Sequence, residues 1–554
     1  MNKKKAHILT LIIVFSFIPG FLSQTFNLEL SSEKKLEKKF LSQISFKKKH
    51  GDSTSIYNEL TKIHKLIKLN GYFLSSLDSI TLKRKKYSAH FNLNEKIDSV
   101  SLKHKNLPPI ISRNFNFLNN NLKIPIEKLE GVINKISKEL EDKGDSFSKI
   151  KLQNITIKNR TLFAEINYKK TKERKVNKLL FKGYNNFPNS FIKNYFDINN
   201  NTTFTKNKLT EISKLSQNLD FASEIKSPEA LFTKDSTYIY VYLRKNKVNS
   251  FDGLINFSSQ ENGKLQFNGY LDLKLKNILN TGESLNLLWN SYEEKRQELS
   301  ITSKKPYIFN TKLSTELNFS IYKQDSTFLN TKFSSHLQYQ IRNNTTLFLS
   351  FSSENSEKLI KTTSNKIETY KSSFFGLGFQ YSIPKNDIFR NDAFYLNITP
   401  SFGKRKSDNT SINQVKLEST ISYLLDLNKR NSMYLKNKTG LLNSESYLEN
   451  ELFRIGGWNT IRGFDKQSIF VKSYILQNIE YRYLTSENSF IYSVTDLALI
   501  STTNNNEKLI GLGLGYLFNS KNSQINISTI IGTNTKNSLN TKNTQLLIKW
   551  TNFF

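Results

Sequence analysis

A regular alternation of apolar and polar residues runs through the second half of the chain, residues 251–554. Leu271, Leu273 and Leu275, for example, alternate with charged residues. Successive side chains of a β-strand point to opposite faces, so the pattern predicts strands with one apolar and one polar face. Segments of about ten residues of this kind are typical of transmembrane β-barrels, although soluble β-sandwiches alternate as well. The polar face is rich in glycine, asparagine and lysine, which would fill a dry core poorly and therefore favours the barrel.

Sixteen such segments can be counted, an even number that closes a barrel without a free edge. They lie at about residues 251–259, 264–276, 282–291, 296–304, 311–322, 328–340, 345–354, 370–382, 394–404, 413–424, 432–441, 472–483, 489–500, 508–518, 523–532 and 543–553. If the preceding domains lie in the periplasm, connections after odd-numbered strands face outward. The longest connection, residues 442–471, follows the eleventh strand and is predicted to be extracellular.

Composition excludes several classes of protein. The sequence contains no cysteine and only 6 histidines, so it offers no disulfide framework, no thiolate chemistry and little for a metal site. No stretch after residue 25 approaches the ~18 consecutive apolar residues of a membrane-spanning helix. Three lysines at 3–5 precede a short apolar run, residues 8–18, and a Pro-Gly break. This arrangement predicts a signal peptide at residues 1–24 and an exported chain.

Residues 25–247 repeat a plan of one strand, two helices and two strands, which predicts three small α+β domains at 25–94, 95–172 and 173–247. Helices on one face of a short mixed sheet leave its edges open, and an open edge can pair with a client strand. The alternative is that these domains are plain spacers. The formal net charge is +34, and more of this excess lies before residue 248 than after it. Such a basic surface either lies against anionic lipid headgroups or is simply a solvated lysine-rich surface.

The long connection contains the run GGWNTIRGF. It resembles the loop-six motif, a Gly-Gly pair followed by (V/I)RG(F/Y), of the outer-membrane assembly and translocation superfamily that includes BamA/TamA-type assembly factors and two-partner secretion transporters. The motif residues here are Gly456, Gly457, Ile461, Arg462, Gly463 and Phe464. The three front units resemble the POTRA (polypeptide-transport-associated) domains of that family. The run 480–482 (EYR) and the glycine-rich run 511–516 resemble its twelfth and fourteenth strands.

The resemblance implies a fold and a pairing. The fold is a set of α+β periplasmic POTRA domains followed by an all-β 16-stranded transmembrane barrel, residues 248–554. The loop is expected to fold into the lumen, where its arginine, Arg462, pairs with an acidic residue on a late strand. Asp496 is the nearest match to that acid, and Glu480 also faces the lumen if its neighbours face lipid. A carboxylate beside a partly desolvated arginine is reasonable, because a bidentate pair fixes its geometry.

The last strand resembles the signal by which barrel proteins are recognised for their own assembly. Ile548, Trp550 and the terminal Phe554 share one face, and Asn552 on that face departs from the usual apolar pattern.

The function implied is non-enzymatic. We expect an outer-membrane insertase or translocase that receives nascent barrel polypeptides and templates them at the seam between the first and last strands, with no cofactor and no metal. Unfolded outer-membrane proteins and outer-membrane lipids are its expected partners, with periplasmic chaperones and accessory lipoproteins as further candidates and no nucleic acid. The alternatives are a two-partner secretion pore for a dedicated exoprotein and a passive outer-membrane channel.

Overall fold

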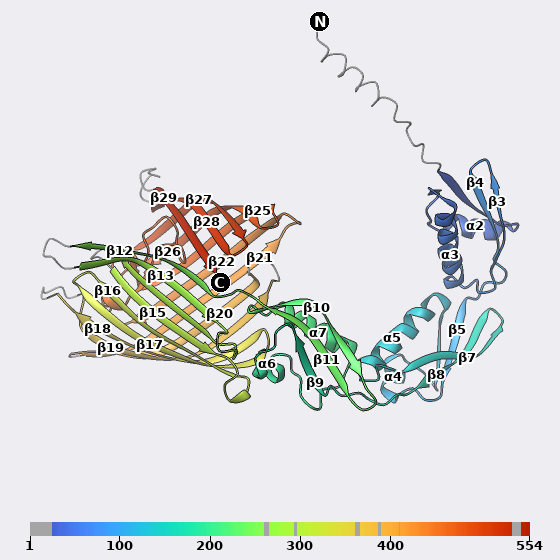
Figure 1. Ribbon diagram of the computed structural model, residues 1–554, viewed down its shortest axis with the longest axis horizontal. Coiled ribbons are helices and arrows are strands. Elements are labelled where there is room, and N and C mark those ends of the chain that lie inside the picture. The colour runs from blue at the N-terminus through green and yellow to red at the C-terminus, as the bar shows by residue number, and fades with distance from the viewer. Residues whose placement is uncertain are drawn as a thin grey trace, which may run out of the picture. The chain divides into compact units, whose positions relative to one another are not determined.

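The computed structural model describes residues 25–259, 265–292, 296–360, 366–385, 389, 391–408, 410–534 and 544–554 (Figure 1). The predicted signal peptide lies outside these residues. The chain forms two compact units, one up to Arg174 with Phe204–Lys206, and one of Lys175–Thr203 with Asn207–Phe554. In the described residues, no helix combines the length and the apolar character needed to cross a membrane.

The first sheet of the first unit has the strand order β2-β1-β4-β3, with β1 and β4 parallel. Its elements are β1 (Phe26–Ser31), α2 (Lys35–Gln43), β2 (Lys49–His50), α3 (Ser53–Leu69), β3 (Ser76–Lys83) and β4 (Lys86–Asn92). Helix α3 begins at Asp52, whose carboxylate accepts a hydrogen bond from the Ser55 N–H at 2.6 Å, as expected of an N-cap. Its apolar stripe packs on the sheet through Ile56, Leu60, Ile63 and Ile67.

The second sheet has the order β6-β5-β8-β7. Its elements are β5 (Ser99–His104), α4 (Pro109–Asn114), β6 (Asn121–Pro125), η1 (Ile126–Lys128), α5 (Leu129–Asp142), β7 (Lys149–Lys158) and β8 (Thr161–Lys169). In the sequence, a short edge strand separates the two helices of each domain: β2 in the first and β6 in the second. The sequence pattern predicted no strand at either place. Strands of two to five residues at a sheet edge carry too little alternation to be recognised in a sequence.

A buried carboxylate ties α2 to the first sheet. Glu37 accepts hydrogen bonds from the Ser32 hydroxyl at 2.5 Å and from the Leu93 N–H at 3.2 Å, and the Lys34 ammonium lies 3.1 Å from it. Burial disfavours its charge, but these donors outweigh burial and hold the pKa of Glu37 below its ordinary value.

A third, three-stranded sheet of order β10-β11-β9 belongs to the second unit. Its elements are β9 (Lys178–Lys182), α6 (Asn189–Asn194), α7 (Lys206–Gln217), β10 (Ala222–Phe232) and β11 (Thr237–Lys245). Side chains join it to one rim of the barrel that follows. The Asn277 amide donates to the Tyr184 hydroxyl at 2.6 Å, and the rings of Phe191 and Tyr307 meet edge to face at 4.9 Å.

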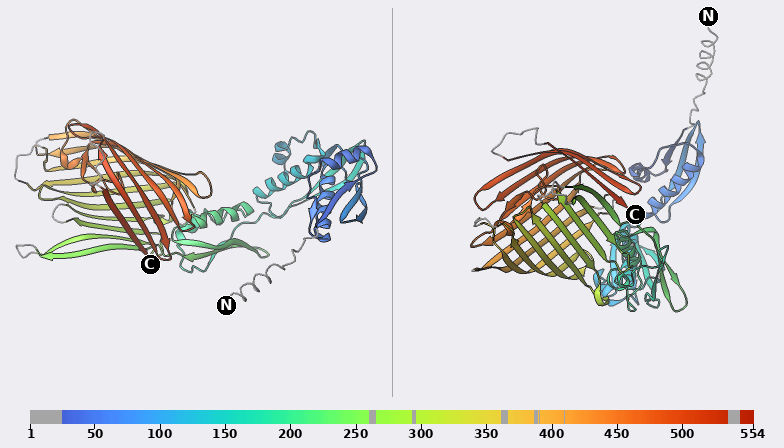
Figure 2. Two further views of the ribbon diagram at one scale, coloured as in Figure 1. Left: turned by 90° about the horizontal axis from the view of Figure 1, so that it is seen from above. Right: turned by 60° about the vertical axis from the view of Figure 1, so that its left-hand side comes forward.

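The remaining strands close into an all-antiparallel barrel of sixteen, which confirms the predicted number and class (Figures 1 and 2). They are β12 (Ser250–Ser259), β13 (Leu265–Lys276), β14 (Ser284–Tyr292), β15 (Arg296–Lys305), β16 (Leu313–Gln324), β17 (Phe328–Arg342), β18 (Thr345–Lys358), β19 (Tyr370–Pro384), β20 (Asp392–Ser407), β21 (Thr410–Asp426), β22 (Asn431–Ser444), β25 (Ser473–Ser486), β26 (Ser489–Ser501), β27 (Asn506–Ser520), β28 (Ser523–Asn534) and β29 (Thr544–Phe553). The strands run obliquely around the wall in both views of Figure 2, as barrel closure requires.

The two faces of the wall differ as the alternation predicted. Large apolar side chains such as Phe375, Leu377 and Leu514 are exposed on the outside, whereas Asp496 and Arg405 are buried inside. The long connection begins at residue 445 rather than 442, because β22 continues to pair with β21 as far as Ser444. We call the rim at which β22 ends and β25 begins the loop rim.

Candidate functional site: a loop anchored inside the barrel

The connection between β22 and β25, residues 445–472, folds into the barrel and is called the inner loop below. It contains the short helix η3 (Glu449–Glu451) and a two-stranded ladder of β23 (Phe453–Ile455) and β24 (Ile469–Val471). Residues 456–468 between these strands form its tip, which carries the GGWNTIRGF run.

Glycines allow the tip to turn tightly against the wall. Gly456, Gly457 and Gly463 have φ angles of +115°, +87° and +86°, a region that other residues rarely adopt. A side chain on Gly463 would come within 2.6 Å of the Gly532 backbone nitrogen on β28, and a side chain on Gly511 of β27 would collide with the Arg462 carbonyl. The glycines therefore permit a backbone-to-backbone approach of the tip to β27 and β28.

The guanidinium of Arg462 binds two carboxylates on neighbouring strands. Its Nε and Nη2 donate to the two oxygens of Asp496 on β26 at 2.8 and 2.7 Å, and its Nη1 donates to Glu480 on β25 at 2.6 Å. The Arg462 backbone N–H also donates to Asp496, at 2.9 Å. Arg482 holds the other oxygen of Glu480, through Nε at 2.9 Å and Nη2 at 2.7 Å. The two arginines and two carboxylates thus form one network with balanced charge.

Burial makes this network consequential. Asp496 is 0% exposed and Arg462 is 3% exposed, so neither charge is solvated by bulk water. Burial alone disfavours a charged guanidinium, but the hydrogen bonds and the negative charges of Asp496 and Glu480 outweigh it and raise the pKa of Arg462 above its ordinary value. Removing one partner would leave an uncompensated charge inside the wall.

Apolar contacts complete the seat of the tip. Ile461 is 0% exposed and belongs to a cluster with Leu476, Ala498 and Leu509 of the wall. Phe464 packs against the same cluster. A cavity of about 250 Å³ beside the tip is lined mainly by polar side chains, with Trp458, Arg462 and Glu480 among them.

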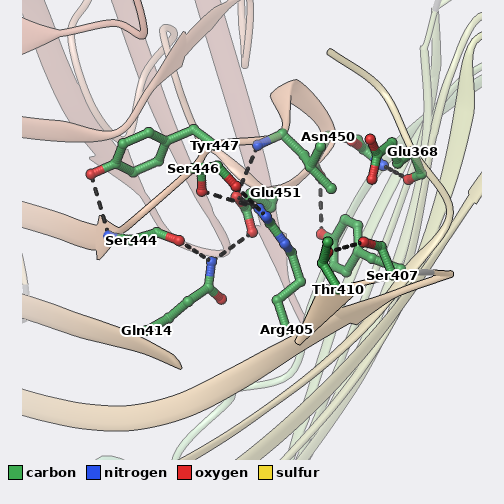
Figure 3. Close-up of polar contacts among 12 residues, drawn as sticks. Glu368, Arg405, Ser407, Thr410, Gln414, Ser444, Ser446, Tyr447, Asn450 and Glu451 are labelled. Atoms are coloured by element: carbon green, nitrogen blue, oxygen red, sulfur yellow. Dashed lines mark hydrogen bonds and ion pairs between the residues drawn. The ribbon is translucent and has the colours of Figure 1, made fainter. Parts of the chain in front are cut away.

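A second buried ion pair, which no sequence motif indicates, anchors the start of the inner loop (Figure 3). Arg405 on β20 pairs with Glu451 and donates to the Ser446 hydroxyl at 2.8 Å. The Gln414 amide on β21 donates to the same Glu451 carboxylate at 2.9 Å. The side chains of Arg405 and Glu451 are 2% and 5% exposed. Alternation places Arg405 on the inner face, but nothing in the sequence indicates a partner 46 residues away.

Asn450 extends this anchor over the neighbouring strands. Its amide donates to the Ser356 hydroxyl on β18 and to the Glu368 carbonyl, both at 2.7 Å. The backbone carbonyl of Asn450 accepts hydrogen bonds from the Asn330 amide on β17 at 2.7 Å and from the Tyr370 hydroxyl on β19 at 3.2 Å. The start of the loop is therefore bonded to the inner face of β17 through β21.

Residues 465–467 of the tip contact strands on both sides of the place where the first strand, β12, meets the last strand, β29. The Lys466 ammonium and the Gln467 amide bind Glu298 on β15, at 2.8 and 3.2 Å. The Gln545 amide on β29 donates to Asp465 at 3.0 Å. The inner loop thus spans the lumen and is bonded to β15, the fourth strand of the barrel, to strands in the middle of the barrel and to the last strand, β29.

The barrel closes through a very short ladder. Strand β12 pairs with β29 at two positions in register, Ser250↔Phe553 and Phe251↔Asn552, and the Phe554 N–H donates to the Asn249 carbonyl at 2.9 Å just beyond them. The next shortest ladder between neighbouring barrel strands, β13 with β14, has eight. The facing edges at residues 252–259 of β12 and 545–551 of β29 have no strand partner in the described residues. On their other sides, β12 is paired with β13 over its whole length and β29 is paired with β28 from Thr544 to Asn552.

The predicted C-terminal residues lie apart from the inner loop. Ile548, Trp550 and Phe554 are 63%, 55% and 54% exposed on the outside of the wall. Asn552 lies at the closure, where it accepts a hydrogen bond from the Ser523 hydroxyl of β28 at 2.7 Å. Among the described residues, no group of three or more His, Asp or Glu side chains is arranged to hold a metal ion.

Solved structures share this fold. The chain resembles CdiB from Escherichia coli, with 13% sequence identity and a TM-score of 0.50, over 90% of this chain and 98% of that one. CdiB from Acinetobacter baumannii matches with 15% identity, a TM-score of 0.50 and the same shares of the two chains. BamA from Haemophilus ducreyi lacking POTRA domains 1–3 matches at 14% identity over 81% of this chain and 98% of that one, with a TM-score of 0.47. No protein-family model and no curated protein matches the sequence.

Proposed function

We propose that this chain, whose fold is that of the outer-membrane assembly and translocation superfamily, lies in the outer membrane and inserts nascent β-barrel polypeptides there. Its α+β domains face the periplasm and receive the unfolded client. Strands β12 and β29 then separate and pair with the strands of the client. The short ladder between β12 and β29 is the observation that carries this proposal.

The physical reason lies in the unpaired strand edges. In the part of the chain that the structure describes, the facing edges of β12 at residues 252–259 and of β29 at residues 545–551 carry backbone N–H and C=O groups without a strand partner. Another strand can pair with such groups regardless of its side chains. A backbone hydrogen bond contributes about 0.5–1.5 kcal/mol net, so a two-position ladder costs little to open. Exchange of backbone hydrogen bonds requires neither a nucleotide nor a redox cofactor.

The inner loop has a defined part in this mechanism. Its tip binds β29 through Asp465 and β15 through Lys466, so it braces the wall on both sides of the closure. While it is docked, the network around Arg462 holds the tip to β25 and β26. The loop therefore holds the barrel in one shape while the closure opens.

A disulfide across the closure tests the proposal. The chain has no cysteine, so an engineered pair is the only one present. Phe251→Cys with Asn552→Cys joins β12 to β29 at a position where they already pair. The matched control, Ser523→Cys with Asn552→Cys, uses the same cysteine but ties β29 to β28, its neighbour on the other side. Each variant is reconstituted in liposomes and assayed for insertion of an unfolded barrel protein, oxidised and then reduced.

The expected result is that oxidation abolishes insertion in the β12–β29 variant, that reduction restores it, and that the control inserts in both states. Equal insertion by the oxidised β12–β29 variant and the control would contradict the proposal.

A secretion pore is the second candidate, and the polar cavity beside the loop tip favours it. Transport through the lumen would require the loop tip to undock from the inner wall. The disulfide between β12 and β29 could stay intact during such transport. Export of an exoprotein by the oxidised β12–β29 variant would therefore support the pore.

A further inference from the structure

Three lysines gather on the outer face of the barrel at the loop rim. Lys371 lies on β19, and Lys404 and Lys406 lie on β20. All three are exposed, while the residues that alternate with them, such as Tyr370 and Arg405, are buried on the inner face (Figure 3 shows Arg405). The strand register places Lys371 directly opposite Lys406 and places Lys404 opposite Ser373.

This arrangement is unfavourable for the protein alone. Like charges directly opposite each other on neighbouring strands destabilise the pair. The buried ion pair of this part of the rim, Arg405 with Glu451, lies on the inner face and cannot neutralise the lysines outside. In the part of the chain that the structure describes, none of the three lysines takes part in an ion pair. An anion held between them would relieve the repulsion.

An apolar groove lies directly below the lysines. Phe375 and Phe402 oppose each other across β19 and β20 and are 64% and 66% exposed. Val415 on β21 lies opposite Phe402, and the Phe351 ring on β18 lies 4.9 Å from the Phe375 ring. The groove has a volume of about 750 Å³; Phe375, Phe402 and Val415 line it on the apolar side, and Lys404, Asn443 and the single carboxylate Glu445 are among its polar lining residues.

We propose that this surface, the lysine–phenylalanine groove, binds a phosphorylated lipid of the outer leaflet. Its phosphate groups lie between Lys371, Lys404 and Lys406, and an acyl chain lies along Phe375 and Phe402. Two observations select this occupant. The cationic end faces away from the apolar band of the wall, as a headgroup does, and the apolar end continues that band. The inference rests on the proposed location in the outer membrane but does not depend on insertion of clients.

Binding by the purified full-length protein in detergent tests the inference. The probe is bisphosphorylated lipid A, and the comparisons are the same lipid with its phosphates removed and inorganic phosphate. The test variant is Lys371→Gln/Lys404→Gln. The control is Lys323→Gln/Lys508→Gln, which removes two exposed lysines from β16 and β27 at the same rim. Lys323 and Lys508 lie opposite the uncharged Leu329 and Leu499.

A lysine near an anionic lipid surface contributes roughly fivefold in affinity, so the test variant should bind lipid A about 25-fold more weakly than the parent. The control should stay within about twofold of the parent, because its lysines lie outside the groove. Equal weakening by both double variants would overturn the inference, as would equal binding of the dephosphorylated lipid. Inorganic phosphate that competes fully with lipid A would overturn it too, because it would indicate a site for a free anion. No client polypeptide is present, so the result is independent of the insertion assay.

Discussion

Replacing Arg462 by methionine tests whether the arginine holds the tip of the inner loop in place. The change removes three guanidinium hydrogen bonds of 2.6 to 2.8 Å. Asp496, at 0% exposure, then keeps the backbone N–H of residue 462 as its one hydrogen-bond donor among the described residues. Glu480 keeps Arg482 as a partner. Breaking a buried ion pair by removing one partner typically costs about 3–5 kcal/mol. A docked tip should therefore become roughly 10²- to 4 × 10³-fold easier to release, since each 1.4 kcal/mol is about tenfold.

The release can be measured by cysteine labelling. Ile461 is fully buried, and the sequence has no other cysteine, so Ile461→Cys is a single reporter that a maleimide reaches when the tip leaves its seat. Arg462→Met is then compared with Arg454→Met in this reporter background. Arg454 also belongs to the inner loop but stacks on the Tyr322 ring at 3.7 Å, a contact that contributes about 0.5–1 kcal/mol at a partly exposed site.

The expected labelling rates differ strongly. Arg462→Met should label at least 10²-fold faster than the reporter alone, and Arg454→Met about two- to fivefold faster, by the free energies above. Adding Asp496→Asn to Arg462→Met should restore part of the protection, because the buried charge is then gone. Equal rates for the two arginine variants would refute the role assigned to the network.

Three further predictions concern single positions. Arg405→Met should destabilise the folded barrel by about 3–5 kcal/mol, measured as a lower temperature at which the folded band disappears on electrophoresis. Arg405→Met/Glu451→Leu should recover much of that stability, because no unpaired charge remains. If the double variant recovers none of it, packing rather than charge holds this part of the loop. Gly463→Ala should release the tip by about 1–3 kcal/mol in the labelling assay, because its φ is +86°, whereas Gly131→Ala, with open space around its Cβ, should not. Glu37→Gln should lower the melting temperature of the first unit near pH 7. Folding lowers the pKa of Glu37 from about 4.5, so the stability that the Glu37 carboxylate contributes is full above pH 4.5 and is lost as the pH falls through the lowered pKa. A difference in melting temperature between parent and variant that grows towards pH 3 would contradict this role of Glu37.

The strands of the barrel are almost entirely determined by local sequence. Alternation is a property of adjacent residues on one strand, and it located all sixteen strands to within a few residues of their observed ends. The amphipathic spacing of Ile56, Leu60, Ile63 and Ile67 predicted α3 for the same reason. The short edge strands β2 and β6 were missed, since their pairing comes from the neighbouring strand rather than from a pattern of their own.

The sequence by itself therefore determined which residues form strands, which face of each is apolar, and where the glycine-rich tip lies. Only the tertiary structure decided which residues oppose one another. The pairing of Arg405 with Glu451, the two-position ladder of β12 with β29, and Lys371 opposite Lys406 all depend on strand register and on closure of the barrel. Register is fixed by the whole ring of strands at once, because every strand must satisfy two neighbours, and no single segment carries that information.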